Sequence, residues 1–169
     1  VFAEDKQTRK IALDKILPHQ RDDFVHIFKA MAGKPVNIRL LDPPLHEFLP
    51  HQKNEKLEIA SHLDISIEEV ERRISGLEEF NPMLGHRGCR LAITFPEIYM
   101  MQARAIIEAA LIAHGEGLEV YPEIMIPLVG LAEGLSILRS EVVSEIESVF
   151  TEQSKRIDYK CGTMIELPR

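Results

Sequence analysis

An arginine near the end of a short apolar segment is the first side chain in this sequence suited to binding a small anion. Arg39 lies near the carboxyl end of the segment of residues 35–41, whose branched apolar residues are typical of a buried strand. A guanidinium group in such a place needs a partner of opposite charge. That partner is a ligand anion, or else Asp42 or a helix carboxylate, and the spacing alone leaves both open. Arg39 is therefore a candidate substrate-binding residue.

A glycine-rich segment supplies a second basic candidate. Residues 85–90 read GHRGCR, so Arg87 lies between two glycines. Glycines let backbone N–H groups approach a phosphate or carboxylate closely, and the planar guanidinium of Arg87 suits the same anions. The alternative is an ordinary turn with solvated charges, in which His86 is structural and Arg90 pairs with a helix.

A carboxylate near the carboxyl terminus is the third candidate. Glu166 lies between Ile165 and Leu167, where burial without a partner would be costly. Mg²⁺ is one suitable partner, since it commonly takes one or two carboxylates and completes its shell with substrate and water. An ion pair with Arg39 or Arg87 is the other, and the two are compatible.

Composition and missing motifs exclude several classes of function. The 169 residues include 20 Lys and Arg against 27 Asp and Glu, a formal charge of −7 that argues against nucleic-acid binding. The longest apolar stretch, residues 124–132, falls short of the roughly 18 residues of a membrane span. The sequence has no Walker lysine motif, G-x-S-x-G, H-E-x-x-H or C-x-x-C, so we assign no catalytic residue and no zinc site. Cys89 and Cys161 are too few for a disulfide framework, and with no signal-peptide core the expectation is a cytoplasmic piece of a longer chain.

Hydrophobic periodicity and breaker residues predict the elements that position these side chains. Helices are predicted for residues 8–17, from Pro18 to Gly33, after a capping box at residues 66–69, after a second capping box at residues 94–97 as far as Gly115, and for residues 131–153. Strands are predicted for residues 35–41, somewhere within 87–93, for 123–128 and for 159–167.

Strands and helices therefore alternate from Pro35 onward, which predicts an α/β fold with parallel strands. An open doubly wound sheet and a (β/α)₈ barrel both satisfy this order. No G-x-G-x-x-G follows a strand, so the commonest dinucleotide site is excluded, and we favour the barrel.

Four segments resemble the pyruvate, phosphate dikinase family. They are RLLDPPLHEFLP at 39–50, NPMLGHRGCRL at 81–91, PEIMIPL at 122–128 and GTMIELPR at 162–169. The resemblance implies that residues 1–169 are part of one phosphoenolpyruvate- and pyruvate-binding domain, truncated at both ends. It also implies a partial (β/α)₈ barrel of about strands 2 to 5, with residues 35–42 as the second strand and residues 159–167 as the fifth.

The same resemblance implies roles for the candidate residues. Arg39 and Arg87 would hold the phosphoryl group and carboxylate of phosphoenolpyruvate, and Glu166 would be one of two Mg²⁺-binding acids. The family interconverts ATP, phosphate and pyruvate with AMP, diphosphate and phosphoenolpyruvate through a phosphohistidine. The phosphohistidine domain of the parent chain would be a partner, and the other substrate, metal and proton-transfer residues would lie outside this sequence.

Two alternatives and two consequences accompany this interpretation. A phosphoenolpyruvate synthase-type barrel fragment is disfavoured by the segment DPPLHEF at 42–48, and a non-catalytic interaction module remains open. A partial barrel would expose strand edges, which predicts self-association to a homo-oligomer. The isolated piece is predicted to lack turnover.

Overall fold

The computed structural model describes residues 5–44, 49–76 and 85–167, and the chain divides into two compact units. The first unit holds Ala3–Asp42 and Gly88–Arg169, and the second holds Pro43–Arg87. The first unit contains α1 (Lys6–Ala30), β1 (Pro35–Arg39), α4 (Cys89–Thr94), α5 (Pro96–Gly115), β2 (Tyr121–Ile126), α6 (Ala132–Gln153) and β3 (Lys160–Thr163). The second contains α2 (Lys53–Leu63) and α3 (Ile67–Ser75).

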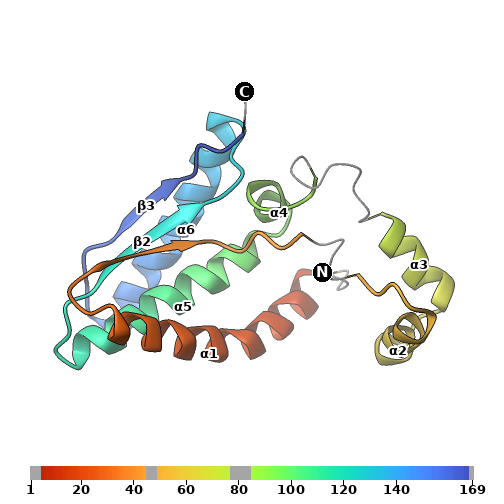
Figure 1. The fold of residues 1–169 in the computed structure, drawn as a ribbon, viewed down its shortest axis with the longest axis horizontal. Helices are drawn as coiled ribbons and strands as arrows, with labels where there is room; N and C mark the ends of the chain where they lie inside the picture. Colours follow the sequence, from red (N-terminus) through yellow and green to blue (C-terminus); the bar gives the residue numbers. More distant parts are fainter. Residues whose placement is uncertain (1–4, 45–48, 77–84, 168–169) are drawn as a thin grey trace. The chain divides into compact units, whose positions relative to one another are not determined.

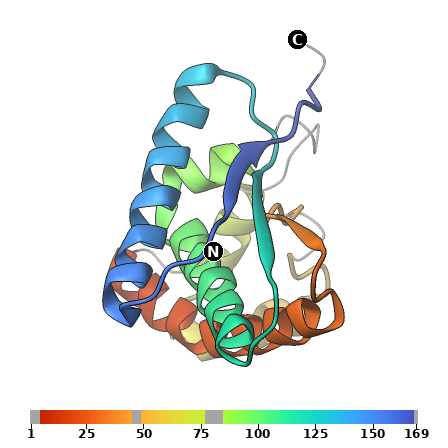
Figure 2. The same ribbon diagram turned by 90° about the vertical axis from the view of Figure 1, so that its left-hand side faces the viewer.

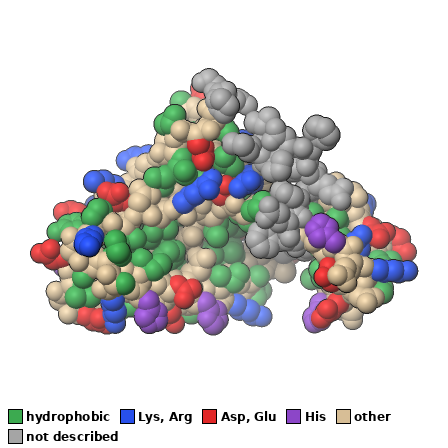
Figure 3. Space-filling model, viewed as in Figure 1, with side chains coloured by type: hydrophobic (Ala, Val, Ile, Leu, Met, Phe, Trp, Pro, Cys, Tyr) green, Lys and Arg blue, Asp and Glu red, His purple; other side chains and the backbone are tan. Residues whose placement is uncertain are grey.

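A parallel sheet in the order β1-β2-β3 is the centre of the first unit. In its register Arg39 lies opposite Met125, and Met125 lies opposite Gly162. Side chains alternate along β1, where Val36 and Ile38 are buried and the intervening residues are exposed. Helices α5 and α6 cover the buried face (Figures 1 and 2), so Arg39 belongs to the opposite face. On this opposite face of the sheet, the space-filling view shows apolar side chains beside charged ones (Figure 3).

The N-terminal helix α1 is continuous through Pro18, so the prediction of two helices here was wrong. Asp5 caps the helix by accepting the N–H of Thr8 at 2.7 Å. Proline removes one backbone donor, but the packing of α1 along α5 maintains the helix through this exposed position. Arg9 strengthens that packing with an ion pair to Glu97.

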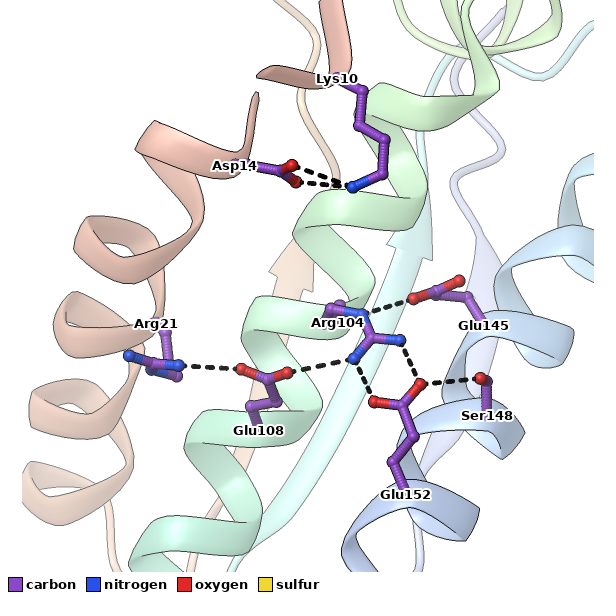
Figure 4. A network of polar contacts seen from close by, with 8 residues as sticks. All are labelled: Lys10, Asp14, Arg21, Arg104, Glu108, Glu145, Ser148 and Glu152. Carbon is purple, nitrogen blue, oxygen red and sulfur yellow. Dashed lines mark hydrogen bonds and ion pairs between the residues drawn. The ribbon is translucent and has the colours of Figure 1, made fainter. Parts of the chain in front are cut away.

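A polar network holds α1, α5 and α6 together (Figure 4). Arg104 on α5 donates to Glu145 at 2.6 Å and to Glu152 at 2.7 Å, both on α6. Glu108, one turn further along α5, accepts from Arg21 on α1 at 3.1 Å. Hydrogen bonding to Arg104 lowers the pKa of Glu152 from its ordinary 4.5 to about 2. Helix α5 therefore has a fixed position beneath the sheet.

The second unit contains a pair of helices with a small apolar core. Ser66 caps α3 by accepting the N–H of Glu69 at 3.2 Å, which confirms the predicted helix start. Helix α2 was not predicted, because its sequence shows a rise in polarity rather than a clear apolar period. The core between the helices consists of Leu49, Ala60, Val70 and Ile74.

The predicted strands at 35–41, 123–128 and 159–167 are confirmed, each shorter than or slightly displaced from its expected bounds. The strand expected within residues 87–93 was wrong, because Cys89–Thr94 forms α4. The second capping box was also wrong, since the hydroxyl of Thr94 donates to the carbonyl of Arg90 and Phe95 holds the N-cap position of α5. The helices expected to end at Gly115 and to cover 131–153 are confirmed as α5 and α6.

The described chain is thus a mixed α/β structure with a small parallel sheet, as the alternation of elements predicted. It holds three strands where the resemblance implied four, and β1 pairs directly with β2. Among the described residues, no helix has both the length and the apolarity needed to traverse a lipid bilayer.

Candidate anion-binding site at the carboxyl edge of the sheet

Arg39 is the last residue of β1 and lies where the parallel strands end. Its Nη2 donates to Asp42 at 2.7 Å and lies 3.4 Å from Oε1 of Glu166. The Asp42 side chain is only 3% exposed, whereas the Arg39 side chain is 43% exposed. One nitrogen of the guanidinium therefore faces two carboxylates while the rest of the group reaches the surface.

Glu166 reaches this edge from the segment after β3. Its Oε1 accepts the backbone N–H of Leu128 at 2.8 Å, just beyond the end of β2. Leu128 has a φ of 54°, a left-handed conformation that is uncommon for a residue with a Cβ. Such backbone strain persists only where surrounding contacts impose it. The turn after β2 is thus fixed with its N–H directed at the carboxylate of Glu166.

A glycine at the start of α4 permits the close approach of these loops. Gly88 has a φ of 56°, and a Cβ built on it would lie 3.0 Å from Cβ of Leu128 and 3.2 Å from Oδ1 of Asp42. Those separations are shorter than ordinary van der Waals contact. The adjacent N–H of Cys89 donates to the carbonyl of Pro127 at 3.1 Å, which joins the start of α4 to the end of β2.

The carboxylate oxygens at this edge suit a hard cation that takes few of its ligands from the protein. Glu166 is 23% exposed and offers carboxylate oxygens, the ligand type that Mg²⁺ prefers. Asp42 is nearly buried and already paired with Arg39, so Glu166 is the more accessible ligand. No group of three or more His, Cys, Asp or Glu residues suited to a metal occurs in the described ranges. The residues present fit a Mg²⁺ ion that takes most of its ligands from water and substrate.

Arg87 belongs to the second unit, and its relation to Arg39 and Glu166 stays a prediction. Its backbone N–H donates to the carbonyl of Gly85 at 3.0 Å, which closes a tight turn, and its side chain is half-buried. Of the three predicted site residues, the structure brings Arg39 and Glu166 together.

Two buried ionisable groups lie close to the Arg39–Asp42 pair. Burial, together with the charge of Asp42, raises the pKa of Tyr99, whose side chain is fully buried. Burial likewise raises the pKa of the Cys89 thiol, against a smaller opposing effect of Arg90. Both groups are therefore neutral at physiological pH, and neither is suited to act as a nucleophile there.

Sequence reasoning treated Gly88 only as one of the two glycines around Arg87 and gave Leu128 no role. Gly88 carried a signal, since glycine positions near basic residues permit close backbone approach. Leu128 carried none, because its importance comes from a backbone conformation that an apolar side chain does not indicate.

Comparison with known proteins gives this edge a family context. Residues 2–169 match the family model described as PEP-utilising enzyme, PEP-binding domain. Over its full length the chain is 55% identical to pyruvate, phosphate dikinase of Rhizobium meliloti (strain 1021), 50% to that of Giardia intestinalis and 45% to that of Clostridium symbiosum.

The chain spans about a fifth of these relatives, covering 19%, 19% and 20% of their respective lengths. The resemblance drawn from the four motifs is confirmed at this level. Both the full-length matches and the family model lead to one conclusion: the chain belongs to the PEP-binding domain family of PEP-utilising enzymes.

Proposed function

We propose that this chain is part of the phosphoenolpyruvate- and pyruvate-binding (β/α)₈ barrel of a pyruvate, phosphate dikinase. Such an enzyme interconverts ATP, phosphate and pyruvate with AMP, diphosphate and phosphoenolpyruvate through a phosphohistidine on another domain. Parallel neighbouring strands joined by helices support the barrel, because (β/α)₈ folds are built from that unit. In such barrels the active site lies at the carboxyl ends of the strands, the edge that holds Arg39 and Glu166.

Arg39 would bind the phosphoryl group or carboxylate of phosphoenolpyruvate. Within the described chain, Nη2 is the one nitrogen of the Arg39 guanidinium that makes ion pairs or hydrogen bonds. The donors on Nε and Nη1 are therefore available to an anion. Asp42 and Glu166 hold the guanidinium in place before substrate arrives. Donors fixed in advance stabilise developing negative charge without a cost of reorganisation during phosphoryl transfer.

Glu166 would hold Mg²⁺ through its carboxylate while the Leu128 N–H fixes the orientation of that carboxylate. A bound Mg²⁺ would supply Lewis-acid polarisation of the keto oxygen of pyruvate. Removal of Glu166 would take away a ligand of Mg²⁺. It would also leave Asp42 as the remaining carboxylate partner of Arg39 in the described chain, so Glu166 has two separable effects.

Arg87 would provide the second guanidinium for the same anion. Its planar group allows a bidentate contact with a phosphoryl group or carboxylate, which a lysine does not reproduce. The turn of Gly85 and Arg87 supports this role, because a closed turn restricts the backbone that carries the side chain.

The meeting of Arg39 and Glu166, 127 positions apart in the sequence, is the observation that carries this proposal. Calorimetry on the full-length protein tests it, with oxalate as a mimic of enolpyruvate and with or without Mg²⁺. We expect Mg²⁺-dependent binding that is lost in Arg39→Ala. In Glu166→Gln, whose amide oxygen still accepts the Leu128 N–H, we expect the dependence on Mg²⁺ to be lost.

Arg156→Ala is the matched control, since the exposed Arg156 pairs with the half-buried Glu147 and precedes β3, at the amino ends of the strands. Its oxalate affinity should equal that of the wild type. If the wild-type protein gives no heat with oxalate and Mg²⁺, the chain is a non-catalytic module and the proposal is wrong.

The isolated chain is proposed to lack turnover and to self-associate. In the described residues β1 and β3 each have one strand neighbour, so each leaves an edge available for pairing with another copy. Size-exclusion chromatography that gives a monomer at micromolar concentration would contradict the self-association.

A further inference from the structure

A buried glutamine of α5 contacts the backbone next to the anion-binding edge. Gln102 is 4% exposed, and its Oε1 accepts the N–H of Leu41 at 2.7 Å. A buried amide group is costly unless it is hydrogen-bonded, so this contact offsets the placement of a polar side chain among apolar neighbours.

Leu41 is the first residue after the strand ladder of β1. The ladder ends with Leu40, whose N–H donates to the carbonyl of Met125 at 2.9 Å. The N–H of Leu41 has moved beyond the sheet, and the side chain of Gln102 supplies its acceptor. Leu41 therefore lies in the segment between Arg39 and Asp42, whose side chains form an ion pair.

The anchor for this segment is a helix that has other contacts to hold it. Helix α5 is joined to α6 through Arg104 and to α1 through Glu108 (Figure 4), so the position of Gln102 does not depend on the segment after β1. A side chain on a rigid helix fixes a neighbouring site more accurately than a loop does.

We propose that Gln102 is a positioning residue, which holds the backbone at Leu41 so that Asp42 orients Arg39 toward the bound anion. The inference rests on the proposed function, because it concerns how the same site is held. Gln102 acts through the backbone and does not touch the substrate.

The test uses the full-length protein and the variants Gln102→Met and Gln102→Glu. Methionine has a similar length and no suitable oxygen acceptor, whereas a carboxyl group retains an oxygen for the Leu41 N–H. Three quantities are measured: the affinity for oxalate with Mg²⁺, the melting temperature, and the hydrogen exchange of the backbone amides of Leu40 and Leu41. Met101→Leu is the control, since it changes the neighbouring buried residue of the same helix, conserves its approximate volume and removes no hydrogen bond.

We expect Gln102→Met to speed amide exchange at Leu41 but not at Leu40, and to weaken oxalate binding about 10-fold, the effect of one lost buried hydrogen bond. Gln102→Glu should bind oxalate more tightly than Gln102→Met, and Met101→Leu should match the wild type. Should Gln102→Met fail to fold, Gln102→Asn, whose amide stops one methylene short, should show the same loss of binding.

Wild-type affinity in Gln102→Met with faster exchange at Leu41 would overturn the inference while leaving the proposed function intact. Equal loss of affinity in Gln102→Met and Gln102→Glu, in step with the melting temperature, would show a structural role only. Absence of oxalate binding in the wild type would refute the proposed function, and the inference with it.

Discussion

Replacing Gly88 by alanine should disrupt the proposed anion-binding edge by pushing apart the two segments that meet there. The new Cβ would lie 3.0 Å from Cβ of Leu128, which is fixed to the backbone and does not swing away. It would lie 3.2 Å from Oδ1 of Asp42, the carboxylate that holds Arg39. The substitution therefore acts on Asp42 and Leu128 together, and through them on Arg39 and Glu166.

The expected destabilisation has two parts. Gly88 has φ 56° and ψ −129°, a backbone region that residues with a Cβ rarely adopt, at a cost of about 1–3 kcal/mol. Overpacking of a filled site costs about 1–3 kcal/mol more. The free energy of unfolding of this unit should fall by about 2–6 kcal/mol, and relaxation of the clash should displace Asp42.

Gly117→Ala separates the two parts. Gly117 has a φ of 90° and nothing within 4 Å of a built Cβ, so alanine there brings backbone strain without the clash. The assays are the apparent melting temperature and the oxalate affinity of the full-length protein with Mg²⁺. Gly88→Ala should melt lower than Gly117→Ala and bind oxalate at least 10-fold more weakly. Equal melting temperatures with unchanged affinity in both would refute the reasoning.

Three further predictions concern other parts of the chain. Pro18→Ala should raise the melting temperature, because alanine at this exposed position restores a backbone donor and avoids a penalty of about 3 kcal/mol; an unchanged or lower value would contradict the continuous helix. Arg87→Lys should raise the KM for phosphoenolpyruvate at least 10-fold, and a KM equal to the wild type would argue against a bidentate contact. The pKa of Glu152 is about 2, below its ordinary 4.5, so its stabilising effect is present above pH 4.5 and is lost as the pH falls toward 2. The melting temperatures of Glu152→Gln and wild type should therefore differ at pH 7 and converge near pH 2, whereas a constant difference would exclude this ionisation as the cause.

The contact of Arg39 with Glu166 illustrates what sequence reasoning can reach. Each residue lies near the carboxyl end of a predicted strand, and parallel strands bring their carboxyl ends to one edge, so an ion pair between them was among the alternatives. The strand positions and the long helices were predictable because their apolar periods are strong.

The errors arose where local signals compete with packing. Pro18 normally ends a helix, but contacts of α1 with α5 maintain it. Residues after Gly88 have mixed polarity with no clear period, and the start of α4 contacts the distant segment of Pro127 and Leu128, which local sequence does not indicate. Gln102 did carry a signal, since it is a polar residue one turn from Ile98 and Ile106 in an apolar stripe, but its partner at Leu41 lies 61 positions away.

The separation of Arg39 from Glu166 also bears on the order of events during synthesis. During translation Arg39 and Asp42 are synthesised early, whereas Glu166 is added 127 residues after Arg39. Throughout that interval Asp42 is available as a local counter-charge for the guanidinium. Contacts of such long range form late, because the intervening chain has to be ordered first. A nascent chain should therefore complete the proposed anion- and Mg²⁺-binding site only after β3 has docked.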